Sequence, residues 1–310
     1  MKIAFVFPGQ GSQSVGMLRA VAARPAVSSA LRRASDALGF DIARMIDEGP
    51  AEELGLTINT QPCMLVAGYA LFSAWREAGG AMPAIVAGHS LGEYTALTAA
   101  GAFDLESAVR LVRDRAIAMQ EAVPVGTGGM AAILGLSDAD VVAACTEGAQ
   151  GEVVEAVNFN APSQVVIAGH RGAVDRACAA AKARGAKRAV TLAVSAPFHS
   201  SLLQPAADRL RERLAGVAVA APSVPVINNV DVAIEHDPAR IRDALARQAA
   251  RPVRWTEIVT RMAAEGVTHV VECGPGRVLA GLTKRIVPSL ESLELRDDVT
   301  LADCLARIGS

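Results

Sequence analysis

A serine flanked by two glycines is the clearest candidate for chemistry in this sequence. Residues 87–96 read AGHSLGEYTA, so Ser90 lies between Gly88 and Gly92 in the pattern G-x-S-x-G. This pattern is typical of a nucleophilic serine on a sharp turn between a strand and a helix, where small neighbours let the backbone bend. The same letters read S-x-x-E from Ser90 to Glu93, the pattern of a capping box that only starts a helix. The two interpretations conflict, because a capping serine turns its oxygen toward backbone N–H groups. We favour the nucleophile.

A nucleophilic serine needs a general base, and histidine is the usual one. The chain offers five histidines: His89, His170, His199, His236 and His269. His89 is next to Ser90, and adjacent side chains usually diverge. His199 lies in the segment SAPFHSS, where the middle of the chain gives way to its last third. Position alone favours His199 without excluding a structural role for it.

An arginine on the apolar face of a helix is the third candidate. In the segment DLESAVRLVRDRAIAMQEA, Arg115 lies four residues after Leu111 and four before Met119, on a stripe that is otherwise apolar. An inward guanidinium is costly unless an anion pairs with it. Arg115 could form a salt bridge to a buried Asp or Glu, reach out to water, or hold a substrate carboxylate in a bidentate grip.

A glycine loop follows the first apolar run of the chain. Residues 8–13 read PGQGSQ, which lacks the Lys-Ser/Thr of a P-loop and is not G-x-G-x-x-G. The loop could present backbone N–H groups, or the amide of Gln10, to a developing oxyanion. Taken alone, it is better explained as an ordinary tight turn.

The elements that must position these residues follow from the hydrophobic pattern. Apolar runs at residues 2–7 and 84–88 predict buried strands. Helical spacing or composition follows at residues 27–38, 62–78 and 93–103. The clearest later strands are at residues 224–230 and 267–274. Ser90 therefore lies between a strand and a helix, and the alternation predicts an α/β fold with a mostly parallel sheet.

The middle of the chain has a different order of elements. It predicts, in sequence, a strand, a helix, two strands around a turn, a helix and a strand at residues 128–136, 137–148, 153–170, 171–185 and 186–195. The order β-α-β-β-α-β is that of a ferredoxin-like unit. We therefore expect residues 126–195 to be an insertion in a larger α/β domain.

Composition argues against several classes of protein. The 310 residues are 51% apolar and 20% charged, with a net charge of −2, which gives no support for nucleic-acid binding. No apolar run of about 20 residues or secretory signal is present, so we expect no membrane span. Five cysteines are scattered without C-x-x-C spacing: Cys63, Cys145, Cys178, Cys273 and Cys304. This argues against a disulfide framework or a metal site and favours the cytoplasm.

Several motifs together identify a family. The chain carries, in order, FVFPGQGSQ, GHSLGEY, RLVRDRAIAMQEAVPVGTGGMAAILG, VNFNAPSQVVIAG, PFHS, INNVDV and ECGPGRVLAGLTKRI. This set, spanning about residues 2–287, resembles the malonyl-CoA:acyl carrier protein transacylases of fatty-acid synthesis. Acyltransferases of polyketide synthases share the motifs and are the alternative. The resemblance implies a large α/β-hydrolase-like subdomain of residues 1–125 and 196–310, a small ferredoxin-like subdomain of residues 126–195, and a cleft between them.

The resemblance implies a ping-pong transfer of a malonyl group. Ser90 is the nucleophile that takes the malonyl group from malonyl-CoA. His199 is its base and later the acid, and Arg115 grips the free carboxylate of the malonyl group. The phosphopantetheine thiol of acyl carrier protein then takes the malonyl group from the serine. No cofactor or metal is implied, and the family suggests a monomer.

Further residues take roles from the same resemblance. The backbone N–H groups of Gln10 and Leu91 form the oxyanion hole, and a carbonyl of Gln248 orients the histidine. Three side chains line the site: His89, Asn160 and Phe198. The bulky ring of Phe198 is expected to crowd an α-methyl group, which would favour malonyl over methylmalonyl units.

Partner docking and two rival functions complete the expectations. Acyl carrier proteins are acidic, so a basic surface is expected, with Arg277, Lys284 and Arg285 as candidates beside the alternative of a solvated helix face. One rival is an α/β-type serine hydrolase, which usually places an acidic residue before the histidine and needs no inward arginine. The other is a non-enzymatic scaffold or inactivated subunit, and the joint presence of Ser90, His199 and Arg115 speaks against it.

Overall fold

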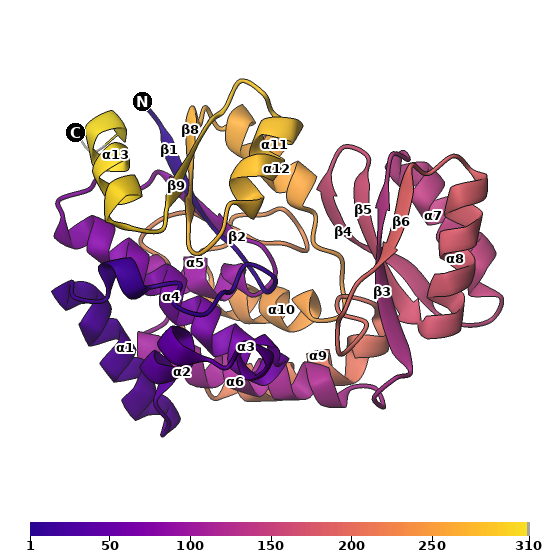
Figure 1. Cartoon of the computed structure of the whole chain (residues 1–310), viewed down its shortest axis with the longest axis horizontal. Coiled ribbons are helices and arrows are strands. Elements are labelled where there is room, and N and C mark those ends of the chain that lie inside the picture. The colour runs from indigo at the N-terminus through magenta and orange to yellow at the C-terminus, as the bar shows by residue number, and fades with distance from the viewer. Residues whose placement is uncertain (309–310) are drawn as a thin grey trace.

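The computed structural model describes residues 1–308 and contains two sheets of different kinds (Figure 1). A five-stranded sheet has the order β7-β2-β1-β8-β9, and every neighbouring pair in it is parallel. Its strands are β1 (Ile3–Phe7), β2 (Ile85–Gly88), β7 (Val226–Ile227), β8 (His269–Cys273) and β9 (Glu291–Leu295). The predicted parallel sheet is confirmed.

Helices cover both faces of the parallel sheet, because its central strand is apolar on both sides. Phe5 and Phe7 of β1 pack into the larger core, and Ala4 and Val6 pack into a second core on the opposite face. The larger core includes residues of α1 (Pro25–Leu38), α2 (Ile42–Glu48), α3 (Ala51–Gly55), α4 (Thr57–Glu77), α5 (Gly92–Ala99) and α6 (Leu105–Glu121). The opposite core includes residues of α11 (Trp255–Ala264) and α12 (Val278–Ile286).

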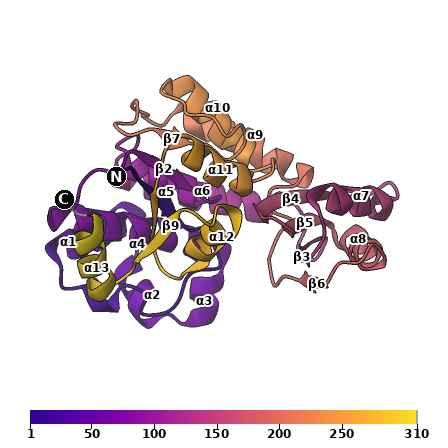
Figure 2. The same cartoon turned by 90° about the horizontal axis from the view of Figure 1, so that it is seen from above.

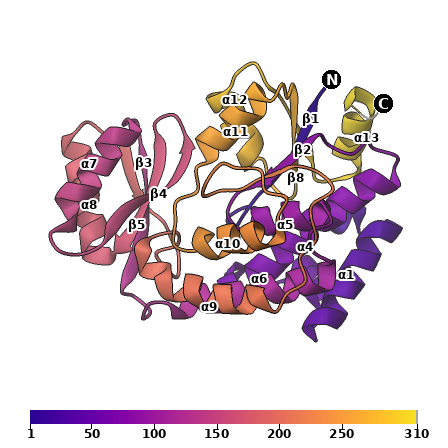
Figure 3. The same ribbon diagram turned by 180° about the vertical axis from the view of Figure 1, so that it is seen from behind.

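Three more helices pack around the parallel sheet and complete the large subdomain. They are α9 (Gln204–Ala215), α10 (Pro238–Gln248) and α13 (Asp298–Ile308), with short 3₁₀ turns at Arg19–Val21 and Ser201–Leu203. Seen from behind, α9 packs on both α6 and α10 (Figure 3). Across residues 1–308, no helix is both long and apolar enough to cross a membrane.

The second sheet is antiparallel and has the order β4-β5-β3-β6. Its unit runs β3 (Gly128–Leu134), α7 (Asp138–Ala149), β4 (Val154–Ala161), β5 (Gln164–His170), α8 (Arg171–Ala183) and β6 (Arg188–Thr191), which is the predicted β-α-β-β-α-β order. Helices α7 and α8 lie on the side of this sheet turned away from the rest of the molecule (Figure 2). The fold class, a large α/β subdomain with a small ferredoxin-like one, is confirmed. The boundaries at residues 126 and 195 stay a prediction.

Three predicted elements differ from the structure. The strand predicted at residues 186–195 covers only β6 (Arg188–Thr191). Helix α4 begins at Thr57 and contains Pro62, whereas the sequence predicted a start at Pro62. Proline suits a first turn, but packing of this almost fully buried helix outweighs the hydrogen bond that Pro62 cannot donate. The predicted strand at residues 224–230 is reduced to β7, because Asn229 turns its amide to Gly88 and Asn228 accepts from Asp231 in a local turn.

Candidate active site

The turn at Ser90 is a strained elbow that its two glycines make possible. Ser90 follows β2 and has a backbone φ of 53°, in the left-handed region. A Cβ atom on Gly88 would lie 1.8 Å from the carbonyl carbon of Gly92. A Cβ atom on Gly92 would lie 2.0 Å from the carbonyl oxygen of Phe7. Both positions therefore require glycine, as a nucleophile elbow does.

The capping-box interpretation of Ser90 and Glu93 is wrong. Helix α5 begins at Gly92, and its N-terminal flanking residue is Leu91, which makes no side-chain cap. The Ser90 hydroxyl contacts His199 instead of a helix N–H group. Glu93 is buried, and its Oε2 accepts hydrogen bonds from the Asn229 N–H group and the Gln248 side chain rather than from Ser90. The positive φ of Ser90 turns its side chain away from the helix.

His199 is a buried, neutral imidazole beside the serine. Its Nε2 lies 2.7 Å from Ser90 Oγ, and its Nδ1 lies 2.8 Å from the main-chain oxygen of Gln248. Because a carbonyl oxygen can only accept, Nδ1 carries the proton and Nε2 is left to accept from the serine hydroxyl. Burial, followed by the positive charge of Arg115, lowers the pKa of His199 to about 3. The His89 ring makes a different hydrogen bond, with 2.8 Å between its Nε2 and Asn160 Oδ1.

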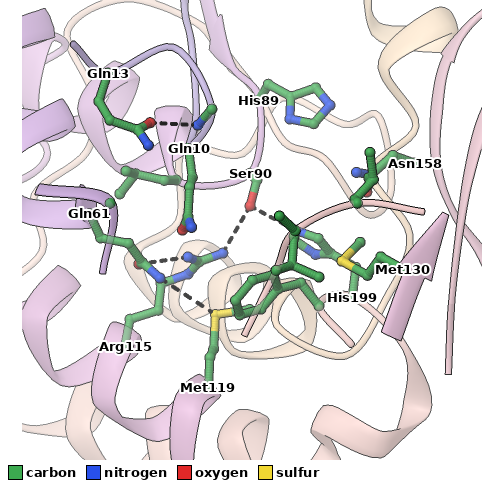
Figure 4. A pocket seen from close by; sticks show the side chains of 17 residues that line it. Gln10, Gln13, Gln61, His89, Ser90, Arg115, Met119, Met130, Asn158 and His199 are labelled. Carbon is green, nitrogen blue, oxygen red and sulfur yellow. Dashed lines mark hydrogen bonds between the residues drawn. The ribbon is translucent and has the colours of Figure 1, made fainter. Parts of the chain in front are cut away.

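Arg115 is fully buried and is held by neutral groups. Its Nη1 donates to Gln61 Oε1 at 2.7 Å, and its Nη2 donates to Ser90 Oγ at 3.1 Å (Figure 4). The same Nη2 donates to Gln248 Oε1 at 2.8 Å. The guanidinium also lies 5.3 Å from the centre of the Tyr94 ring. Among residues 1–308, no carboxylate forms a salt bridge with Arg115, and its side chain does not reach water. Neither structural explanation considered from the sequence applies.

Ser90, His199 and Arg115 line one cavity of about 470 Å³. Its wall includes predicted residues and others that the sequence did not indicate: Gln10, Gln61, His89, Ser90, Leu91, Arg115, Met119, Met130, Asn158, Phe198 and His199. Met130 and Asn158 belong to the antiparallel sheet, so the cavity lies between that sheet and the large subdomain that carries Ser90 (Figure 4). Asn160 reaches the site through His89, a residue of the wall, with 2.8 Å between Asn160 Oδ1 and His89 Nε2. Its role in lining the site stays a prediction.

Gln10 and Leu91 both line the cavity next to Ser90. Among the described residues, neither backbone N–H group donates a hydrogen bond to the protein. The loop that carries Gln10 presses on the elbow, because a Cβ atom on Gly9 would lie 2.7 Å from the carbonyl oxygen of His89. Two unused N–H donors beside the serine are what stabilisation of an oxyanion requires.

Asn229 holds the elbow and was missed by the sequence analysis. Its side chain accepts from the Ser90 N–H group at 2.7 Å and donates to the Gly88 oxygen at 2.7 Å. Its own N–H group donates to Glu93 Oε2 at 2.9 Å, and the residue is fully buried. A signal existed, because polar residues directly after a strand beside β2 meet the same sheet edge as Ser90.

Comparisons with known proteins agree with this geometry. The acyl transferase domain family matches residues 4–302. The malonyl CoA-acyl carrier protein transacylase of Salmonella typhimurium is 56% identical over 99% of this chain and 99% of its own length. The chain belongs to the malonyl-CoA:acyl carrier protein transacylase family. The enzyme is therefore an acyltransferase, which contradicts both the hydrolase and the scaffold alternatives.

Solved structures of transacylases superpose closely on this one. The acyl-carrier-protein S-malonyltransferase of Burkholderia pseudomallei is 64% identical, with a TM-score of 0.98 over 99% of this chain and 100% of its own. A malonyl-transacylase in complex with a type II PKS acyl-carrier protein is 51% identical, with a TM-score of 0.98 over 99% of this chain and 100% of its own.

The three cations expected to bind a carrier protein differ in their surroundings in this transacylase. Arg277 pairs with Glu294, with 2.7 Å between Nε and Oε1. Arg285 donates to the side chain of Gln164 and to the carbonyl oxygen of Pro162. Lys284 is exposed on α12 and forms no ion pair with the described residues. Their docking role stays a prediction.

Proposed function

We propose that this transacylase moves the malonyl group of malonyl-CoA to the phosphopantetheine thiol of acyl carrier protein for fatty-acid synthesis. One observation carries the proposal. Ser90 Oγ lies 2.7 Å from His199 Nε2 and 3.1 Å from Arg115 Nη2, so a nucleophile, its base and a cation for a carboxylate share one cavity. An acyl thioester with a free carboxylate, as malonyl-CoA is, uses all three groups.

The first half-reaction forms a malonyl-serine ester. Ser90 Oγ attacks the thioester carbon while its proton passes to His199 Nε2, which is neutral and free to accept it. The N–H groups of Leu91 and Gln10 then donate to the oxyanion, and one such donor is worth about 3 kcal/mol. The carbon–sulfur bond breaks, and the coenzyme A thiolate takes the proton from Nε2.

The second half-reaction returns the enzyme to its starting state. The phosphopantetheine thiol gives its proton to His199 Nε2 and attacks the ester carbon. The carbon–oxygen bond to Ser90 breaks, and Ser90 Oγ regains the proton from the imidazolium. The carrier thioester is the product, and the histidine is neutral again.

A carbonyl partner is sufficient for this histidine. The Gln248 main-chain oxygen fixes the tautomer, and no carboxylate contacts His199 Nδ1 among the described residues. A carboxylate would raise the basicity of the ring and help complete proton removal. Both partners of the transfer are thiols, which leave more readily than amines, so less basicity is needed. The imidazole has no need of a third charged residue.

Selection of the malonyl group rests on two residues of the cavity. The guanidinium of Arg115 pairs with the free carboxylate of the substrate, and an uncharged acyl chain leaves it unpaired. Phe198 lines the same cavity, and its ring crowds an α-methyl group. The enzyme is proposed to act as a cytoplasmic monomer without a cofactor.

Transfer between substrates tests the function. Enzyme, malonyl-CoA and either holo- or apo-acyl carrier protein are mixed, and the carrier is weighed by mass spectrometry. We expect a malonyl adduct on the holo form alone, since only that form has the thiol. Hydrolysis of malonyl-CoA without carrier adduct would refute the proposal.

A discrete acyltransferase of polyketide synthesis is the second candidate. The observation in its favour is the 51% identical malonyl-transacylase whose structure contains a type II PKS acyl-carrier protein. Comparison of kcat/KM for a fatty-acid and a polyketide carrier protein separates the two. A clear preference for the polyketide carrier would favour the second candidate.

A further inference from the structure

The buried cation of this site is surrounded by amides. Gln61 and Gln248 each place a side-chain oxygen within 2.8 Å of an Arg115 nitrogen, and both glutamines are at most 2% exposed. Buried charges in proteins are normally paired with an opposite charge, because an isolated ion in an apolar interior is costly. Burial lowers the pKa of Arg115, but a guanidinium keeps its proton at neutral pH. The positive charge is therefore oriented without being neutralised.

The buried carboxyl of this network is separated from the cation by one of these amides. Gln248 Oε1 accepts from Arg115, and Gln248 Nε2 donates to Glu93 Oε2 at 2.8 Å. Glu93 has no direct hydrogen bond to Arg115. Burial raises the pKa of Glu93 to about 7, so a large share of this carboxyl is uncharged at neutral pH. Glu93 is therefore a poor substitute for an anion held against the guanidinium.

We propose that Gln61 and Gln248 determine acyl specificity by being amides: they fix Arg115 through neutral oxygens, so the substrate carboxylate is the first full negative charge to pair with it. This inference rests on the proposed malonyl transfer. It assigns to the two glutamines a role separate from the orientation of His199, which uses the main chain of Gln248.

Gln61 is the better of the two glutamines for testing this role, because it makes few other contacts. Its Oε1 contacts Arg115 Nη1 at 2.7 Å, while its Nε2 lies 4.0 Å from the sulfur of Met119, a weak contact. Glutamate has nearly the same shape and would keep the acceptor oxygen in place. At that distance from a guanidinium it would be ionised, so it would act as a built-in competitor of the substrate carboxylate.

The experiment compares Gln61→Glu with Gln61→Met in the full chain. Methionine removes the acceptor oxygen but leaves the charge of Arg115 uncompensated. For each variant, kcat/KM is measured for transfer from malonyl-CoA and from acetyl-CoA to holo-acyl carrier protein, together with Tm. In Gln61→Glu we expect the malonyl-to-acetyl ratio to fall by about 10- to 100-fold, the range of a charge-assisted hydrogen bond, with a raised KM for malonyl-CoA.

Stability separates this role from a structural one. Gln61→Glu is expected to match or exceed the Tm of the wild type, since the buried cation gains a charged partner. Gln61→Met is expected to lose Tm and overall rate while it keeps its preference for malonyl. A role in packing alone would lower Tm and both transfer rates together.

Two outcomes overturn the inference: an unchanged malonyl-to-acetyl ratio in Gln61→Glu, or equal loss of the ratio in both variants. If Gln61→Glu does not fold, the double variant Glu93→Gln with Gln248→Glu replaces it, because an amide at position 93 can donate to the new carboxylate at position 248, and the same loss of the ratio is expected. The wild type, measured in parallel, distinguishes failure of the proposed malonyl transfer from failure of this inference. If it fails to transfer malonyl, the proposed function is wrong; if it succeeds and the Glu variant keeps its ratio, only this inference is wrong.

Discussion

Replacement of Arg115 by alanine should exchange malonyl specificity for acetyl tolerance. The guanidinium is 1% exposed and lies 3.1 Å from the nucleophile oxygen, so a carboxylate paired with it is placed in a dry site beside the reacting carbon. Loss of a hydrogen bond to a charged group costs about 1.5–3 kcal/mol. Two such bonds in a bidentate pair amount to about 3–6 kcal/mol, or about a 100- to 20,000-fold loss in kcat/KM for malonyl-CoA.

The acetyl reaction should behave differently in the same variant. An acetyl group makes no ion pair with Arg115, so its transfer loses no ion pair to the substitution. It also no longer leaves a buried cation unpaired, which favours a gain in kcat/KM for acetyl-CoA. The opposing cost is that the side-chain oxygens of Gln61 and Gln248 lose their donor.

The assay follows both acyl-CoA substrates to holo-acyl carrier protein by mass spectrometry under initial-rate conditions. Arg110→Ala is the matched control, because Arg110 is an exposed residue of the same helix, α6. Circular dichroism establishes that both variants are folded. A malonyl-to-acetyl ratio in Arg115→Ala equal to that of Arg110→Ala would refute the role assigned to Arg115.

Three further predictions concern the supports of the elbow. Asn229→Ala leaves the Ser90 N–H group and the Gly88 oxygen unpaired. The free energy of unfolding in urea should therefore fall by about 1–3 kcal/mol, and acylation of Ser90 should be slower. Wild-type stability and acylation rate in this variant would contradict the prediction. Glu93 has a folded pKa raised from 4.5 to about 7, so the folded chain retains a proton that the unfolded chain releases, and stability falls as pH rises through that window. Glu93→Gln should remove this decline, worth about 3 kcal/mol between pH 5 and pH 8, and parallel pH curves for the two proteins would count against it. Gly88→Ala should abolish the native elbow, because the added Cβ atom would overlap Gly92. The control Gly281→Ala should stabilise the fold by about 0.5–1 kcal/mol, because Gly281 is exposed on α12 with open space around it. Similar melting curves for the two variants would show that the elbow is not tightly packed.

The fold was largely readable from the sequence because its elements carry strong local patterns. The apolar run of β1 and the alternation of helices and strands at residues 126–195 follow from periodicity. The start of α4 did not, because Pro62 is a local signal for a helix start that long-range packing overrides. The strand at residues 224–230 was overestimated because Asn229 bonds to the distant Gly88, while Asn228 accepts from Asp231 in a local turn.

The sequence revealed site residues whose type is unusual for their position and did not reveal the others. Ser90 between glycines and Arg115 on an apolar stripe both stand out locally. Asn229 bonds to Ser90 across 139 positions of the chain, and Gln61 meets Arg115 across 54, so no local pattern marks either. The sequence left the capping box open as an alternative because φ at Ser90, which decides where its hydroxyl points, depends on the close contact of Gly88 with Gly92.

The covalent state of Ser90 after exposure to malonyl-CoA tests the central claim most directly. Enzyme is mixed with malonyl-CoA without carrier protein, quenched in acid, digested and mapped by tandem mass spectrometry, with Ser90→Ala as the control. We predict a malonyl ester on Ser90 of the wild type, its loss on addition of holo-acyl carrier protein, and no ester in the control. An unmodified Ser90, or an equal amount of malonyl on the control protein, would contradict the account.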